Sequence, residues 1–116
     1  MPARTDTGDL LQGTLGILIL KSLLAGPSHG YGIARWVEST TDDVLRIEEG
    51  SLYPALRRLE DRGWVRSEWG LSENNRRARF YTITAAGRAH LRAEAGVWMR
   101  YANAVTQVLR AAPAVS

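Results

Sequence analysis

The stretch EEGSLYPALRRLEDRG, Glu48 to Gly63, decides the fold that we predict for this chain. Leu52, Leu56 and Leu59 recur at i, i+4 and i+7, which places the three side chains on one face of a helix. Gly63 is a typical helix stop. The stretch therefore predicts a helix with one apolar face that packs into a core.

Pro54 constrains where this helix begins. A proline has no N–H to donate, and inside a helix its ring clashes with the carbonyl four residues earlier. Neither effect matters in the first turn, so we predict that Gly50 or Ser51 is the N-cap, with the Ser51 side chain able to accept a backbone hydrogen bond. The free N–H groups of such a helix start also suit a phosphate.

The opposite side of the helix carries Tyr53, Arg57 and Arg58. Leucines that face a core, combined with outward donors near the N-terminal half, are typical of a DNA recognition helix. The alternative is a solvated surface on which Arg57 and Arg58 pair with Glu60 and Asp61.

The hydrophobic period changes after Gly63. The segments WVRSEWG (64–70) and ARFYTIT (78–84) alternate and are rich in β-forming residues, and the polar segment LSENNRR (71–77) lies between them. We expect a β-hairpin whose tip carries these candidate DNA-contacting residues: Asn74, Asn75, Arg76, Arg77 and Arg79. Arginines at such a tip suit phosphates or the minor groove, whereas the alternative is merely a soluble turn. Two basic elements on one scaffold favour DNA binding.

Four segments are predicted before the recognition helix. They are a flexible arm over 1–8, a helix over 10–26 with Asp9 as N-cap, a helix over 29–41 capped by Ser28, and a single strand over 42–47. The first helix is apolar on more than one side. We therefore expect two partners to bury it, the rest of the domain and a second subunit.

A last helix is predicted over 85–111, with Thr84 as its N-cap. Its apolar residues alternate four and three apart, the spacing of a coiled-coil seam, and are Leu91, Ala95, Trp98, Ala102, Val105 and Leu109. We expect this seam to form a dimer. An additional interpretation is a slot for a flat aromatic ligand at Trp98 and Met99.

The composition excludes several classes of site. The chain has 116 residues, a net charge of +3 and no cysteine, which fits one small domain and excludes disulfides and thiolate metal sites. His29 and His90 are isolated from other metal ligands, and no acid, base and nucleophile can be assembled. We expect no metal, no cofactor and no enzymatic activity.

The N-terminal segment MPARTDTGD lacks the apolar core of a signal peptide. The apolar run over 10–24 contains Gln12 and Lys21 and is too short and polar to span a bilayer. We expect a cytoplasmic protein without a membrane partner.

Three stretches resemble the PadR family of transcriptional regulators: HGYGI (29–33), GSLYPALRRLEDRGWV (50–65) and SEWG with ENNRRARFYTITAAG (67–87). The resemblance implies a homodimeric winged helix, usually a repressor, that binds an inverted-repeat operator. Its recognition-helix positions correspond to Ser51, Tyr53, Pro54, Arg57 and Arg58, its wing positions to Asn74, Asn75, Arg76, Arg77 and Arg79, and its second-helix tyrosine to Tyr31. The short C-terminal helix and Trp98 resemble the compact branch of the family, which implies that Trp98 contributes to binding planar hydrophobic compounds at the dimer interface.

The expected fold is mainly α with a small β-hairpin, a winged helix-turn-helix followed by a dimerisation helix. We expect an arm over 1–8, a DNA-binding domain over 9–84 and a dimerisation helix over 85–112. The expected partners are double-stranded DNA, a second copy of the chain and a planar hydrophobic effector. The alternatives are a winged-helix module that contacts protein, or a small-molecule-binding protein with an incidental basic surface.

Overall fold

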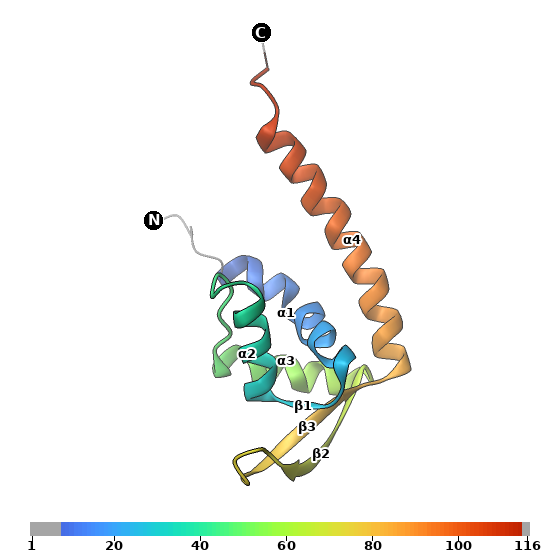
Figure 1. Ribbon diagram of the computed structural model, residues 1–116. Coiled ribbons are helices and arrows are strands. Elements are labelled where there is room, and N and C mark those ends of the chain that lie inside the picture. Colours follow the sequence, from blue (N-terminus) through green and yellow to red (C-terminus); the bar gives the residue numbers. More distant parts are fainter. Residues whose placement is uncertain (1–7, 115–116) are drawn as a thin grey trace.

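The computed structural model describes residues 8–114 and contains a helical body, a small sheet and one long helix (Figure 1). In chain order the elements are α1 (Gly8–Ser22), the 3-10 turn η1 (Leu23–Ala25), β1 (Ser28–His29), α2 (Gly30–Thr40), α3 (Glu49–Asp61), β2 (Val65–Leu71), β3 (Arg77–Ile83) and α4 (Ala85–Arg110). This confirms the expected fold class, mainly helical with a small antiparallel sheet.

The core lies where α1, α2 and α3 meet the base of the sheet and the start of α4. Its fully buried side chains include Leu15, Ile19, Leu20, Leu23, Ile33, Val37, Leu52, Leu56 and Val65. The predicted leucine face of α3 is confirmed, since all three of its leucines are buried. Burying this face determines which side of α3 remains outside.

The predicted hairpin forms, with Val65 opposite Ile83 and Trp69 opposite Arg79. A third strand, β1, pairs antiparallel with the other edge of β3, so the strand order is β1-β3-β2. A strand at Ser28–His29 was not predicted, because two residues are too few to show a hydrophobic alternation.

The strand predicted over 42–47 is wrong. Asp42 and Asp43 adopt positive φ angles of 49° and 64°, and the segment is a turn followed by a loop. Its N–H groups bond locally, from Leu45 to the Thr41 hydroxyl and from Ile47 to the Glu38 carboxylate. A β-branched run without a neighbouring strand has no ladder to join.

Two predicted helix caps are wrong. His29 caps α2, because its Nδ1 accepts a hydrogen bond from the Gly32 N–H at 3.0 Å, while Ser28 donates to the His29 carbonyl. The N-cap of α3 is Glu48, not Gly50 or Ser51.

The first helix begins at Gly8, inside the range predicted for the arm, and its helical turns end at Gly26, which has a φ of 142°. Residues 1–7 of the predicted arm and the side chain of the predicted cap Asp9 lie outside the described part of the chain.

The start of α4 is joined closely to the end of α3. Thr84 caps α4, as predicted, by accepting from the Gly87 N–H, and its hydroxyl donates to the Gly63 carbonyl at 2.7 Å. The Trp64 indole stacks on the His90 ring, with the ring centroids 3.5 Å apart. These contacts orient α4 relative to the helical body.

Candidate nucleic-acid interface

The outer face of α3 and the wing, β2 and β3, enclose a groove. The groove has a volume of about 520 Å³ and is lined by Tyr53, Pro54, Arg57, Glu60, Arg79 and Tyr81. Arg57 therefore lies on the side of α3 that faces the wing. Arg58 is exposed outside this groove and, within residues 8–114, forms no ion pair with Glu60 or Asp61.

The start of α3 differs from the predicted phosphate site. Glu48 and Glu49 occupy the N-cap and the first helical position, and both are exposed. Carboxylates there complement the helix dipole themselves, and their negative charge repels a phosphate. Ser51 is half-buried in the first turn of α3. The start of α3 is thus acidic, whereas Arg57 and Arg58 lie further along the helix.

The wing tip is a tight turn over residues 72–76. The Ser72 N–H donates to the Arg76 carbonyl, and the Asn75 N–H donates to the Ser72 carbonyl at 2.8 Å. Asn75 has a φ of 59°, a conformation that asparagine tolerates better than most residues. The geometry of the turn therefore explains the asparagine at position 75. Asn74 and Arg76 are exposed at the tip.

One face of the wing carries a chain of polar and aromatic contacts. Arg79 Nε donates to Ser67 Oγ at 2.8 Å, and Ser67 Oγ donates to Glu60 Oε2 of α3 at 2.7 Å. The guanidinium carbons of Arg77 and Arg79 lie 4.7 and 5.5 Å from the centre of the Trp69 ring. Arg79 therefore contacts both α3, through Glu60, and β2, through Ser67.

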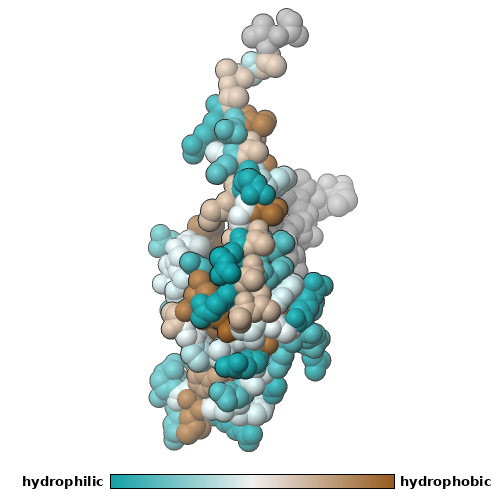
Figure 2. All heavy atoms as spheres, turned by 90° about the vertical axis from the view of Figure 1, so that its right-hand side faces the viewer, coloured by the Kyte–Doolittle hydropathy of each residue, from teal (hydrophilic) through white to brown (hydrophobic). Residues whose placement is uncertain are grey.

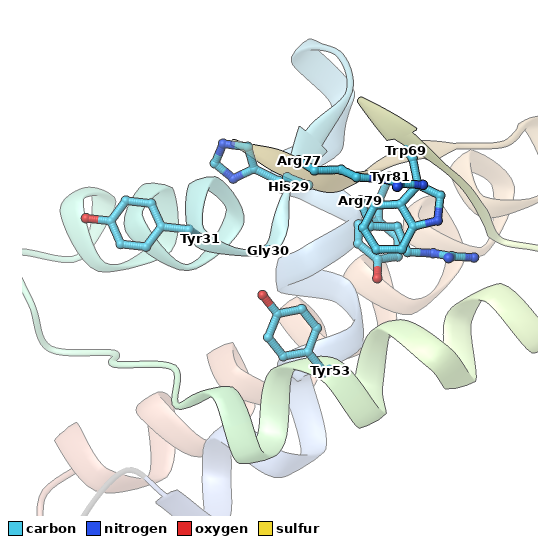
Figure 3. A pocket seen from close by; sticks show the side chains of 9 residues that line it. His29, Gly30, Tyr31, Tyr53, Trp69, Arg77, Arg79 and Tyr81 are labelled. Atoms are coloured by element: carbon cyan, nitrogen blue, oxygen red, sulfur yellow. The ribbon is translucent and has the colours of Figure 1, made fainter. Parts of the chain in front are cut away.

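A second pocket, of about 430 Å³, opens between the start of α2, α3 and the wing (Figure 3). Tyr53 points from α3 toward Gly30, where an added Cβ atom would lie 2.7 Å from the Tyr53 hydroxyl oxygen. Glycine at position 30 thus makes room for the tyrosine. Tyr31 is 68% exposed in the first turn of α2 and lines the pocket's edge.

His29 connects this region to the wing tip. Its Nε2 lies 3.6 Å from the Glu73 carboxylate, and its ring packs edge-on against Phe80. A backbone hydrogen bond within Glu73 lowers the pKa of the Glu73 carboxyl; burial opposes this, and His29 adds a further lowering. Because Nδ1 accepts from Gly32, the proton of a neutral His29 resides on Nε2 and faces Glu73.

Several predicted site residues line two adjoining hollows. Tyr53 and Arg79 line both, whereas Pro54 and Arg57 line only the groove and Tyr31 and Arg77 only the neighbouring pocket. Sequence reasoning missed the residues that position them, namely His29, Gly30, Glu60, Ser67, Trp69 and Tyr81. The sequence could have indicated the position of Trp69. Residues two apart on a strand share a face, so Val65, Ser67 and Trp69 are expected on the same face of the hairpin.

The apolar residues of the predicted seam of α4 differ in burial along the helix. Leu91 is buried against the body, whereas the distal residues Trp98, Val105 and Leu109 are 46%, 38% and 78% exposed. Figure 2 shows hydrophobic residues recurring along the part of α4 beyond the body. The apolar stripe therefore continues past the surface that the chain itself covers.

An apolar cavity of about 410 Å³ lies between α1 and this part of α4. Its walls include Ile17 and Leu18 of α1 and Trp98, Tyr101 and Val105 of α4. Met99 does not line the cavity and is 63% exposed.

The described residues contain no cluster of side chains suited to a metal ion. Within residues 8–114, no helix has both the length and the apolar character needed to cross a membrane.

The arrangement of α2, α3 and the two-stranded wing defines a winged helix-turn-helix protein. The profile of the transcriptional regulator PadR-like family matches residues 19–93. The chain belongs to this family of transcriptional regulators, as the resemblance predicted.

The chain is also similar to solved structures of transcriptional regulators and to one curated sequence. The chain is 30% identical to a transcriptional regulator from Clostridium thermocellum, with a TM-score of 0.77 over 85% of this chain and 96% of that one. It is 31% identical to a PadR family transcriptional regulator from Eggerthella lenta, with a TM-score of 0.73 over 91% and 90% of the two chains. It is also 29% identical to protein X of Lysinibacillus sphaericus, over 72% of this chain and 76% of that protein.

Proposed function

We propose that this protein is a homodimeric transcriptional repressor that binds a pseudo-palindromic DNA operator. The observation that carries the proposal is the groove that Arg57 of α3 and Arg79 of the wing both line. In this arrangement α3 enters the major groove, and the wing arginines hold adjacent phosphates or the minor groove. Family membership supports a regulatory rather than an enzymatic role, exercised in the cytoplasm where the DNA lies.

The homodimer is supported by the apolar residues that α4 leaves exposed. Trp98, Val105 and Leu109 continue a heptad-spaced stripe beyond the body of the chain. A second copy of α4 would cover them and would present two copies of α3. The winged-helix body, which begins at Gly8 and ends near residue 84, would read one half-site, with the two half-sites about one helical turn apart.

A gel shift or footprint on the DNA upstream of the protein's own gene tests this function. We expect salt-dependent binding to one protected, pseudo-palindromic site. A protein-interaction module would bind no such fragment, and a small-molecule-binding protein would bind ligand without operator. Either result would contradict the proposal.

A second function, release by a planar hydrophobic effector, is favoured by the apolar cavity that Trp98 borders. An effector in this cavity would change the separation or tilt of the two α3 helices, provided that it binds the two dimer shapes with different affinity. Titration of planar aromatic compounds should change tryptophan fluorescence, and Trp98→Ala should abolish the change although Trp36, Trp64 and Trp69 remain. A response that survives Trp98→Ala would place the ligand elsewhere.

A further inference from the structure

Trp69 is an exposed aromatic residue in the middle of the basic wing face. It lies on β2 directly opposite Arg79 and is 56% exposed. Its position on the wing is outside the buried core. Core packing therefore does not account for the position of this indole.

The indole is flanked by two arginines from the neighbouring strand. Arg77 and Arg79 are two residues apart on β3, so they share the face on which Trp69 lies. Their guanidinium carbons are 4.7 and 5.5 Å from the Trp69 ring centre, within the distance of a cation–π contact. Figure 3 shows the three side chains gathered on the wing.

This cluster is connected to the recognition helix. Ser67 Oγ accepts from Arg79 Nε and donates to Glu60 Oε2, and a terminal nitrogen of Arg79 lies 3.8 Å from the same carboxylate oxygen. A continuous set of contacts therefore runs from Glu60 of α3 through Ser67 and Arg79 to Trp69 and Arg77. The wing arginines hold their positions relative to α3 through these contacts.

We propose that Trp69 is a positioning residue for DNA binding, and that its indole holds Arg77 and Arg79 in the orientation in which they meet the DNA backbone. The proposal rests on the proposed DNA-binding function. An arginine side chain that moves freely loses rotamer freedom when it binds a phosphate. An arginine side chain that is already stacked on a ring loses less. Trp69 thereby raises DNA affinity without being required to touch DNA.

The test compares Trp69→Phe, which keeps an aromatic face, with Trp69→Leu, which is apolar but not aromatic. Binding is measured by fluorescence anisotropy on a labelled duplex from upstream of the gene and on a random duplex of equal length. We expect Trp69→Leu to weaken binding to both duplexes by about threefold to tenfold, and Trp69→Phe to retain most of the affinity. Trp36→Leu, at a 43% exposed tryptophan on α2, is the matched control and should bind like the wild type.

A double-mutant cycle separates positioning from other roles. In an Arg77→Ala, Arg79→Ala background, Trp69→Leu should have almost no further effect, because no guanidinium remains for the ring to hold. An equal loss in both backgrounds, or equal affinities for Trp69→Leu and Trp69→Phe, would overturn the proposal. If the wild type binds neither duplex, the proposed function itself fails; if it binds and Trp69→Leu binds equally well, only the role of Trp69 fails.

Trp69 accessibility provides a readout that needs no DNA. In a protein whose other tryptophans, Trp36, Trp64 and Trp98, are changed to phenylalanine, acrylamide should quench Trp69 more strongly after Arg77→Ala and Arg79→Ala. Unchanged quenching would show that the arginines do not cover the ring in solution and would contradict the proposal.

Discussion

Pro54 lies further into α3 than the sequence predicted, because the helix begins at Glu49. The proline removes the N–H that would bond the carbonyl of Gly50. Gly50 is exposed, so water can satisfy its carbonyl. The N-cap thus lies two or three residues earlier than predicted, and Glu48 and Glu49 place exposed acids at the start of the helix.

Gly87→Ala is predicted to destabilise the fold. An added methyl group would overlap the Trp64 carbonyl oxygen and lie 2.9 Å from Ile83 Cγ1, and a backbone oxygen cannot move aside cheaply. Alanine is the better helix former by about 1 kcal/mol, but overpacking should cost about 1–3 kcal/mol and force α4 away from the body. Urea unfolding measures the difference.

Gly96→Ala is the matched control for this substitution, since no atom lies within 4 Å of its added methyl group. It should leave stability unchanged or raise it by up to about 1 kcal/mol. Destabilisation of similar size in both variants would show that glycine flexibility, and not the close approach to Trp64, accounts for Gly87.

The environment of Tyr81 leads us to predict that the folded protein loses stability at strongly alkaline pH. Burial, with smaller contributions from Glu60 and Tyr53 against Arg79, raises the pKa of the Tyr81 phenol above its ordinary 10.0. Because the folded-state pKa exceeds the unfolded one, this stability is fully present below the unfolded pKa and is lost as the pH rises through the folded pKa. The denaturation midpoint of Tyr81→Phe should therefore fall less than that of the wild type between about pH 9 and 12. An equal fall of the denaturation midpoint in the two proteins would contradict the contribution of Tyr81 to this pH dependence.

At the scale of elements, one face of the wing has two uses. Near the base of the hairpin, Val65, Tyr81 and Ile83 are buried and complete the core. Further along the same face, Trp69, Arg77 and Arg79 are exposed beside α3. The strand alternation that anchors the wing thus also orients its arginines, because side chains two residues apart point the same way.

Arg76→Ala combined with Arg77→Ala is predicted to weaken binding to specific and random DNA alike, because both arginines are expected to hold phosphates. The slope of log K against log salt should flatten by about 2, close to 0.9 for each lost contact. The control pair is Arg88→Ala with Arg92→Ala, which removes equal charge from exposed positions of α4. An unchanged slope in the wing variant, or an equal change in the control, would exclude the predicted role.

The wing was predictable from sequence in type and extent but not in its contacts. Alternation and the polar turn were sufficient to predict the hairpin, since both are local patterns. The Glu60–Ser67–Arg79 contacts were not, because they depend on how α3 packs against the strands. The pairing of β1 with β3 depends in the same way on residues about 50 positions apart, for which local period carries no information.

At the scale of the molecule, α4 is the feature that the single chain leaves incomplete. The helix contains 26 residues, about 39 Å at the usual rise, and its contributions to the core, Leu91 and Ala95, lie in its first half. In the proposed dimer, a second subunit covers exposed apolar residues of its distal part, such as Trp98 and Leu109.

Leu109→Glu is predicted to weaken the dimer without unfolding the body, because Leu109 is 78% exposed in the single chain. Burying a charge in the seam is unfavourable, so the dimer dissociation constant should rise at least about tenfold, or about 1.4 kcal/mol. Sedimentation velocity over a concentration series measures it. Gln107→Glu, an exposed position off the seam, should leave the constant unchanged, and a comparable shift there would argue for a general charge effect.

The sequence by itself determined the long helices α1 to α4, the hairpin and their order. The leucine face of α3, the alternating hairpin, the Thr84 cap and the seam of α4 are local patterns, and local sterics and periodicity are written in neighbouring residues. Tertiary structure alone decided where α3 begins, that residues 42–47 are a loop while Ser28–His29 form a strand, and which residues meet across the groove. Those outcomes depend on contacts between segments far apart in the chain, whose geometry arises only when the core packs.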